Sequence, residues 1–149
     1  MKYRRSGIRL LVVLAVLLAE FNLYFHLELD RHEDVHMAAV TETAHSTGVT
    51  VVLLNESGAE VESGNAHQVR LQRKLLGVWL PVRRDFTVDY TDEALCYAPH
   101  ASQQVELSWK GAYGEQGPGT YRVLKEFRIV PAAGMGERFW LSAEFTIPD

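Results

Sequence analysis

The strongest constraint on the fold is a strict two-residue alternation close to the C-terminus. Apolar residues occupy every second position from Phe139 to Ile147, and mostly polar residues fill the positions between them. Successive side chains of a β-strand point to opposite faces, whereas a helix needs apolar residues three or four positions apart. The segment is therefore predicted to be a strand with one face in the core and one face in solvent.

The same alternation recurs in other short segments, which are separated by turn residues such as the Gly-rich cluster at 114–119. No longer helical pattern lies between these segments, which argues against a fold of alternating strands and helices. About seven short strands at this spacing predict an all-β antiparallel sandwich. The other predicted strands are 35–43, 49–54, 68–73, 79–82, 105–109 and 121–129.

Charge is unevenly distributed along the chain. Four basic residues lie within the first nine positions, and a purely apolar run follows from Leu10 to Ala19. Apolar residues resume after Glu20 and continue to Leu27, whereas the part from His26 onward carries 11 basic and 18 acidic residues. A basic start, an apolar segment and an acidic remainder are typical of an exported protein.

The length of the apolar segment leaves more than one reading open. Residues 10–19 would span roughly 15 Å as a helix, and the segment extended to Leu27 would span roughly 27 Å of a bilayer core of about 30 Å. Cleavage after Ala19 would place Leu17 at position −3, where a small residue is needed. We therefore expect an uncleaved hydrophobic helix that holds the chain in the membrane through residues 8–27, with a cleaved signal peptide or a buried helix as alternatives. The expected organisation is a signal anchor or signal peptide at 1–27, a polar linker at 28–34 and a sandwich domain at 35–149.

Two short motifs in the second half of the chain are the most specific part of a family resemblance. They are Gly-x-Tyr-Arg-x-x-Lys-Glu at 119–126 and Leu-Ser-Ala-Glu-Phe at 141–145. Together with three further stretches they resemble the bacterial immunoglobulin-like (Ig-like) domain of envelope proteins and lipoproteins, chiefly of Gram-positive bacteria. The resemblance implies an Ig-like sandwich of about seven strands in the envelope, and it carries over no catalytic residues. The further stretches are TGVTVVLLNESG (47–58), VRLQRKLLGVWLPV (69–82) and VELSW (105–109) after Pro99.

Within this reading, a glycine two positions before a tyrosine at the start of a strand is typical of a tyrosine corner. In such a corner the ring is buried and the hydroxyl bonds to nearby backbone. Large aromatic residues on the inward faces of other strands would complete the core. The predicted structural residues are Gly119, Tyr121, Trp79, Trp109, Phe127 and Phe145.

Several residue clusters could in principle carry chemistry, but each has a simpler reading. His32 and His36 have the spacing of two metal ligands on a helix, yet they lie in the polar linker. Cys96 has His100 four residues on, but no nucleophile signature surrounds it. A single cysteine also excludes a disulfide framework and any zinc site that needs two thiolates. We therefore expect no catalytic residue, no cofactor and no metal.

Two charged clusters remain as candidate binding surfaces. Asp89, Asp92 and Glu93 form an acidic loop that could hold calcium or a sugar, although such loops are usually only solvated. The basic residues 70, 73 and 74 and the pair 83–84 surround one predicted hairpin and could meet anionic wall polymer or lipid headgroups. The overall charge of −4 gives no reason to expect nucleic-acid binding.

The sequence thus predicts a membrane-tethered Ig-like module with its C-terminal domain outside the cell. Its expected role is binding or structural, with an unidentified protein or cell-wall partner and without catalysis. One alternative is the outer sensor domain of a membrane-bound regulator. A second alternative is a secreted accessory of an envelope enzyme, released after signal cleavage.

Overall fold

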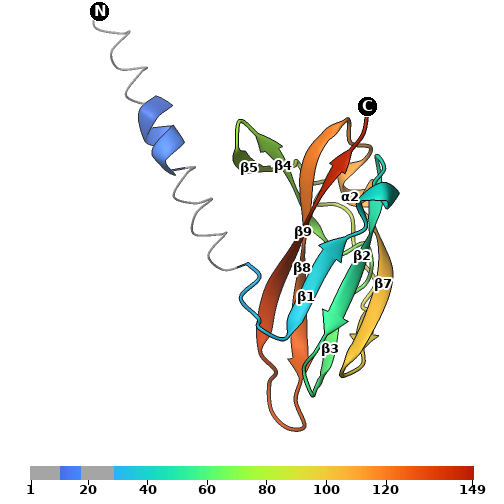
Figure 1. Cartoon of the computed structure of the whole chain (residues 1–149). Coiled ribbons are helices and arrows are strands. Elements are labelled where there is room, and N and C mark those ends of the chain that lie inside the picture. Colours follow the sequence, from blue (N-terminus) through green and yellow to red (C-terminus); the bar gives the residue numbers. More distant parts are fainter. Residues whose placement is uncertain (1–10, 18–28) are drawn as a thin grey trace, which may run out of the picture.

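The computed structural model describes residues 11–17 and 29–149 of the 149-residue chain. Within residues 29–149, nine strands form two sheets, with one short helix and one 3₁₀ turn between them (Figure 1). The elements are β1 (Val35–Ala39), η1 (Thr41–Thr43), β2 (Gly48–Asn55), β3 (Glu60–Gly64), β4 (Arg70–Leu75), β5 (Val78–Pro81), β6 (Ala94–Tyr97), β7 (Ala101–Ser108), α2 (Lys110–Tyr113), β8 (Gly119–Val130) and β9 (Arg138–Ile147).

β8 organises the larger sheet because it pairs with three strands. β9 lies antiparallel along one of its edges over ten residue pairs. The other edge is shared, since β4 pairs with residues 121–124 and β3 pairs with residues 127–130. β5 and β6 then extend the sheet outward from β4 and β3. The larger sheet is therefore forked, and segment 64–69 crosses the gap between its two arms.

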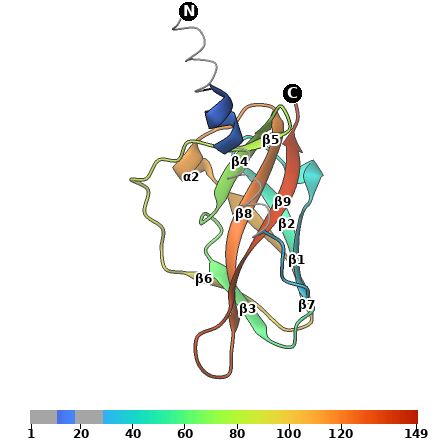
Figure 2. The ribbon, with the colours of Figure 1, turned by 90° about the vertical axis from the view of Figure 1, so that its left-hand side faces the viewer.

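The smaller sheet has the order β1-β2-β7 and packs over the inner face of the larger one (Figures 1 and 2). Aromatic rings connect the two layers. Trp109, which follows β7, stacks on Phe145 of β9 with ring centres 5.3 Å apart, and Phe145 in turn stacks on Tyr121 of β8 at 6.0 Å. Phe127 lies in the same core, between Tyr97 and Phe139. The chain is thus an all-β sandwich of two antiparallel sheets.

Tyr121 has the geometry of a tyrosine corner. Its ring is fully buried, and its hydroxyl donates to the carbonyl of Gly117 at 2.9 Å, four residues upstream. Gly119 makes the turn between them possible, because it has φ +151° and a Cβ there would lie only 3.2 Å from the guanidinium of Arg73. The side chain of Arg73 completes the corner, since it lies over the Tyr121 ring and donates to the carbonyl of Pro118.

Lys125 fills the inner side of the fork. It lies in the inward register of β8, is 1% exposed, and donates from Nζ to the carbonyls of Asn65 (2.6 Å) and Gln68 (3.2 Å). Both carbonyls belong to segment 64–69, in which residues 65–69 pair with no strand of the larger sheet. Burial lowers the pKa of the Lys125 amino group to about 8. The ammonium group therefore replaces the missing strand hydrogen bonds at the gap.

The chain enters the sandwich along β9. Leu29 forms a parallel bridge with Trp140 and is 6% exposed. The Asp30 backbone N–H donates to the Trp140 carbonyl, and the Asp30 carboxylate accepts from both the N–H and the hydroxyl of Ser142, at 2.7 and 2.6 Å. The expected polar linker, residues 28–34, is described from residue 29 onward, and this described part begins with a segment that is bonded to the domain.

Some expectations need correction. The strands number nine within 29–149 rather than about seven, because β3 and β6 have too little alternation to be recognised. The first predicted strand ends at Ala39 and is followed by η1. The expected N-terminal helix lies mostly outside the described residues. Its described part, residues 11–17, is helical. Among the described residues, no helix has both the length and the apolar character needed to cross a membrane.

The tyrosine corner makes a stability prediction. Tyr121→Phe removes one buried hydrogen bond and should lower the free energy of unfolding by roughly 1–3 kcal/mol. Tyr121→Ala also leaves a cavity and should cost roughly 3–5 kcal/mol. Urea unfolding of the full-length protein, followed by tryptophan fluorescence, measures both. The comparison is Tyr90→Phe, because the Tyr90 hydroxyl has no hydrogen-bond partner among the described residues and its removal should cost no stability. Equal losses at 90 and 121 would contradict a special role for the corner.

Lys125 makes a prediction about pH. Below about pH 8 both folded and unfolded chains hold the proton, whereas between about 8 and 10.5 the folded chain has lost it and the unfolded chain retains it. The free energy of unfolding should therefore rise with pH, by roughly 2 kcal/mol from about pH 7.5 to about pH 9.5. Burial raises the pKa of Tyr97 and of Tyr113, which opposes this trend above about pH 10, so the range stops short of it.

The test compares Lys125→Met with Lys110→Met in urea unfolding across this pH range. Lys125→Met should abolish the rise, while Lys110→Met, at an exposed position on α2, should keep it. An unchanged pH slope in Lys125→Met would show that Lys125 does not titrate in this window.

Candidate functional site

The candidate site is a cleft on the outer face of the larger sheet, meaning the face turned away from β1, β2 and β7. The two-residue period of β8 and β9 places inward residues in the core and leaves Arg122, Glu126 and Trp140 on this outer face. β4 adds Arg70 in the same register. Basic, acidic and aromatic side chains from distant parts of the sequence are thereby brought together.

Two guanidinium groups define the cleft. Arg70 of β4 lies over the Trp140 ring at 4.4 Å from its centre, and Arg84 lies over Tyr90 at 5.1 Å. Arg84 and Tyr90 come from the long loop between β5 and β6, which is visible at the left of Figure 2. The cleft between them holds about 230 Å³. Its lining residues are Gly64, Gln68, Val69, Arg70, Arg84, Tyr90, Glu126 and Trp140.

The loop that carries Arg84 and Tyr90 is held at both ends. The N–H of Val82 donates to Leu71 in β4, and that of Asp85 donates to Ala112 in α2. Farther along, the buried side chain of Asn65 donates to the carbonyl and hydroxyl of Thr91. The position of the cleft therefore depends on segment 64–69, whose inner side is bonded to Lys125.

Two residues that line the cleft each hold a buried donor without an acceptor. Within residues 11–17 and 29–149, the Nε of Arg84 and the hydroxyl of Tyr90 are buried and lack a hydrogen-bond partner. The carboxylate of Glu126 also lines the cleft, but it lies 3.6 Å from Arg138. A buried donor without an acceptor costs free energy, and an acceptor group of a ligand would recover it. The cleft is therefore suited to a small group with acceptor oxygens and negative charge.

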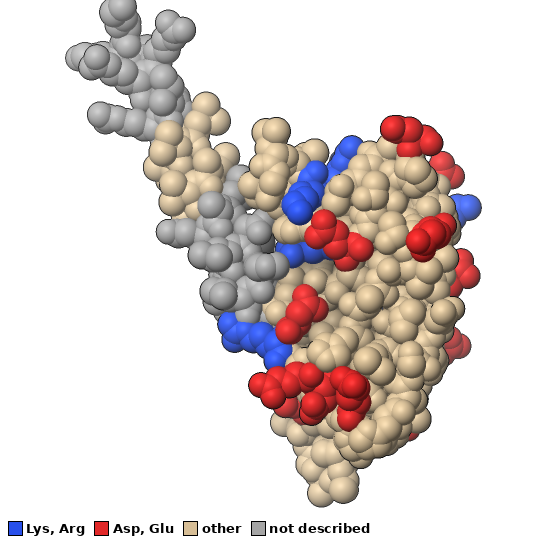
Figure 3. All heavy atoms as spheres, in the orientation of Figure 1, with Lys and Arg blue, Asp and Glu red and all other residues tan. Residues whose placement is uncertain are grey.

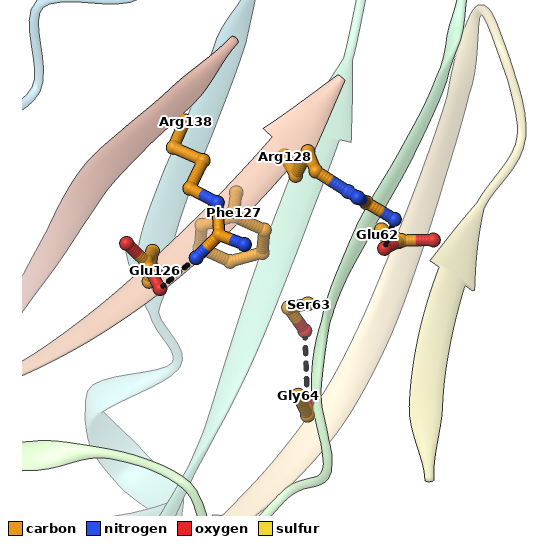
Figure 4. Close-up of a pocket in the computed structure, with 7 residues that line it drawn as sticks. All are labelled: Glu62, Ser63, Gly64, Glu126, Phe127, Arg128 and Arg138. Atoms are coloured by element: carbon orange, nitrogen blue, oxygen red, sulfur yellow. Dashed lines mark hydrogen bonds and ion pairs between the residues drawn. The ribbon is translucent and has the colours of Figure 1, made fainter. Parts of the chain in front are cut away.

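A neighbouring pocket of about 250 Å³ has a different character (Figure 4). Its charged side chains are paired, Arg128 with Glu62 and Arg138 with Glu126. The Ser63 hydroxyl donates to the Gly64 carbonyl. Because its charged side chains are already paired, this pocket offers a ligand fewer unpaired groups than the cleft does. Figure 3 shows how the remaining basic and acidic side chains are spread over one side of the molecule.

Trp79 is the one predicted core anchor that the structure places elsewhere. It is half-buried on the outer face of β5, opposite Lys74, where its ring lies 4.6 Å from the Arg122 guanidinium and 5.0 Å from the Lys74 ammonium. Trp79 pairs with Lys74, which shares the outward register of Arg70 on β4, so the Trp79 ring also points outward. Trp109, Phe127 and Phe145 are core residues, as described above.

The other clusters considered from sequence are not assembled into sites. The His32 ring packs on Phe139 at 4.4 Å, and His36 lies 3.7 Å from Glu56 at the surface. In the part of the chain that the structure describes, no group of three or more His, Cys, Asp or Glu side chains could hold a metal ion.

The remaining candidates are exposed. Cys96 is exposed on β6, and no hydrogen bond joins it to His100 in the described chain. The acidic residues Asp89, Asp92 and Glu93 are exposed in the loop between β5 and β6.

Sequence reasoning missed Tyr90, Trp140 and Lys125 as residues of interest. Arg70 and Trp140 are far apart in the chain, and nothing local indicates that they meet. For Lys125 a signal existed, because it interrupts the apolar face that Val123 and Phe127 continue. A lysine in that register needs buried hydrogen-bond acceptors, and these are backbone carbonyls of segment 64–69.

Comparison with known proteins agrees with this architecture. A family model described as a bacterial Ig-like domain matches residues 31–146. Among solved structures, the ASH/PapD-like domain of human CEP192 (PapD-like domain 7) is 15% identical, covering 78% of this chain and 87% of that one, with a TM-score of 0.34; a likeness at this level carries no argument. A comparison with curated proteins finds no significant match. On the family match, which spans most of the chain, this protein belongs to the bacterial Ig-like domain family.

Proposed function

We propose that this protein is a non-catalytic binding module of the bacterial envelope, held at the outer surface of the membrane by residues 8–27. In this proposal the cleft between the Arg70–Trp140 and Arg84–Tyr90 pairs takes an acidic group of a partner, such as a carboxylate or a phosphate. The observation that carries the proposal is the pair of buried donors, Arg84 Nε and Tyr90 hydroxyl, that have no acceptor among the described residues.

The chemistry of the cleft favours an anion over a neutral ligand. Arg70 and Arg84 bring two positive charges, and the single carboxylate beside them, Glu126, is close to Arg138. Guanidinium groups stacked on aromatic rings keep their in-plane N–H groups available, which suits bonding to carboxylate or phosphate oxygens. The small volume suits one acidic group, so a long polymer would bind by presenting one group at a time.

The binding prediction uses one change that separates binding from folding. Tyr90→Phe removes an unsatisfied buried donor, so it should raise the free energy of unfolding of the unliganded protein by roughly 1 kcal/mol. The same change should weaken binding of an acidic ligand roughly two- to tenfold, because the ligand loses one hydrogen bond. Arg84→Gln should weaken it tenfold or more, since a charged hydrogen bond contributes roughly 1.5–3 kcal/mol.

Calorimetric titration of the full-length protein with poly-L-glutamate, poly(glycerol phosphate) and neutral dextran measures these affinities. Arg83→Gln is the matched control, because it removes the same charge from an exposed position outside the cleft. Equal losses for the changes at 83 and 84 would point to general charge attraction and would contradict a built site. Binding of dextran as tightly as of the two acidic polymers would contradict the anion preference.

The location makes a separate prediction. Alkaline phosphatase fused after Asp149 should be active outside the cytoplasm, because the basic start is expected to stay inside and the acidic remainder to be exported. The intact mass of the membrane-bound product should include residues 1–27. A stable but inactive fusion would overturn the proposed topology, and a mature chain beginning after Ala19 would show that the leader is a cleaved signal.

A further inference from the structure

The loop between β4 and β5 holds a residue that fits its conformation poorly. Leu76 has φ +50° and Gly77 has φ +81°, and the flanking residues Leu75 and Val78 are paired. Two consecutive residues with positive φ are the mark of a type I′ turn, which favours Asn-Gly because side chains such as leucine are strained there. Leu76 is also fully exposed, at 105% of its reference area. This leucine therefore weakens the fold through its backbone and gains nothing from burial.

The residues around the turn form an apolar tip, which we define as residues 75–80 (LLGVWL). Leu75 is 47% exposed, and residues 78–80 are half-buried. Basic residues flank the tip on both sides, with Lys74 before it, at the surface 3.4 Å from Glu144, and Arg83 after it. An apolar loop between basic flanks matches the layering of an anionic bilayer surface, where hydrocarbon lies beneath phosphate groups. Trp79, inside the tip, has the amphipathic ring that favours the headgroup level.

The tip lies at one extremity of the molecule. In Figures 1 and 2 the β4–β5 hairpin extends from the sandwich at the end opposite the loop that joins β8 and β9. The described residues 11–17 lie toward the same end in both views. Figure 3 shows basic side chains beside this end; acidic side chains lie at this end too, over the rest of the face and in a group near the opposite end.

We propose that the tip is a second membrane contact: Leu75 and Leu76 enter the headgroup region of an anionic bilayer, and Lys74 and Arg83 contact the lipid phosphates. The inference rests on the proposed location at the membrane surface. A contact of two leucines and two cations is weak for a free protein, but a tether that holds the tip near the bilayer makes it an intramolecular event. The contact would fix which end of the sandwich faces the membrane.

The test places a polarity-sensitive probe on the tip of the full-length protein. In a Cys96→Ser background, Leu76→Cys carries an NBD fluorophore, and the protein is reconstituted into nanodiscs of phosphatidylcholine with roughly one-third phosphatidylglycerol. The control probe is at Met135→Cys, which is 98% exposed in the loop between β8 and β9. We expect a blue-shifted emission and quenching by spin-labelled lipids for the probe at 76, and neither for the probe at 135.

Two outcomes would overturn the proposal. If the probes at 76 and 135 are equally unquenched, the tip does not reach lipid. If the probe at 76 is blue-shifted but not quenched by spin-labelled lipid, the tip is covered by protein, either a second copy or another segment of this chain.

A failure of the tether is a separate result. If the chain does not enter nanodiscs, the proposed tether fails, and addition of phosphatidylglycerol vesicles to the same labelled protein still shows whether the tip binds lipid.

Two further variants distinguish lipid contact from a role in folding, with the probe now at Leu75→Cys. Leu76→Asn restores the favoured turn sequence, so it should raise the urea midpoint of unfolding while it reduces quenching of the probe. Lys74→Gln with Arg83→Gln should reduce quenching in anionic nanodiscs and have little effect in pure phosphatidylcholine. If Leu76→Asn raises stability without reducing quenching, the role given to Leu76 is contradicted. If the double change at 74 and 83 reduces quenching equally in anionic and in pure phosphatidylcholine nanodiscs, the role given to the basic flanks is contradicted.

Discussion

The fold depends on the buried amino group of Lys125, at the place where the larger sheet divides. β8 pairs with two different strands on one edge, and the arms part at residues 125 and 126. Lys125 points inward and bonds two carbonyls of the connecting segment, while Glu126 points outward into the cleft. The same interruption thus produces a polar junction inside and part of the cleft outside. Removing the gap by continuous pairing would remove both.

The outer face differs from the core in its relief. Among the described residues the core contains stacked aromatic rings, whereas the outer face is hollowed by the cleft. One wall of this cleft comes from the long loop between β5 and β6. That loop carries Arg84 and Tyr90 across the sheet, and Asn65 holds its far end through Thr91.

The parts of the fold that were predictable from sequence are those in which one face of a strand is buried along its whole length. β9 is the clearest example, and the tyrosine corner follows from the Gly-x-Tyr spacing. β3 and β6 were not recognised, because EVESG and ALCY are short and their pairing depends on β8 and on each other. The expectation that Trp79 lies in the core is wrong, because alternation separates the two faces of a strand but does not tell which face of the β4–β5 hairpin points toward the core. The cleft was not predictable, since Arg70 and Trp140 meet only through the pairing of β4, β8 and β9.

The way the chain joins β9 has a mechanical consequence. Leu29 and Asp30 are bonded to Trp140 and Ser142, in the middle of the strand, before the chain continues to β1. A pulling force transmitted through residue 29 therefore reaches β9, at an edge of the larger sheet, first, and β1 bears load only after the Asp30 carboxylate has released Ser142. These contacts would thus protect the pairing of β1 with β2 from tension applied at residue 29.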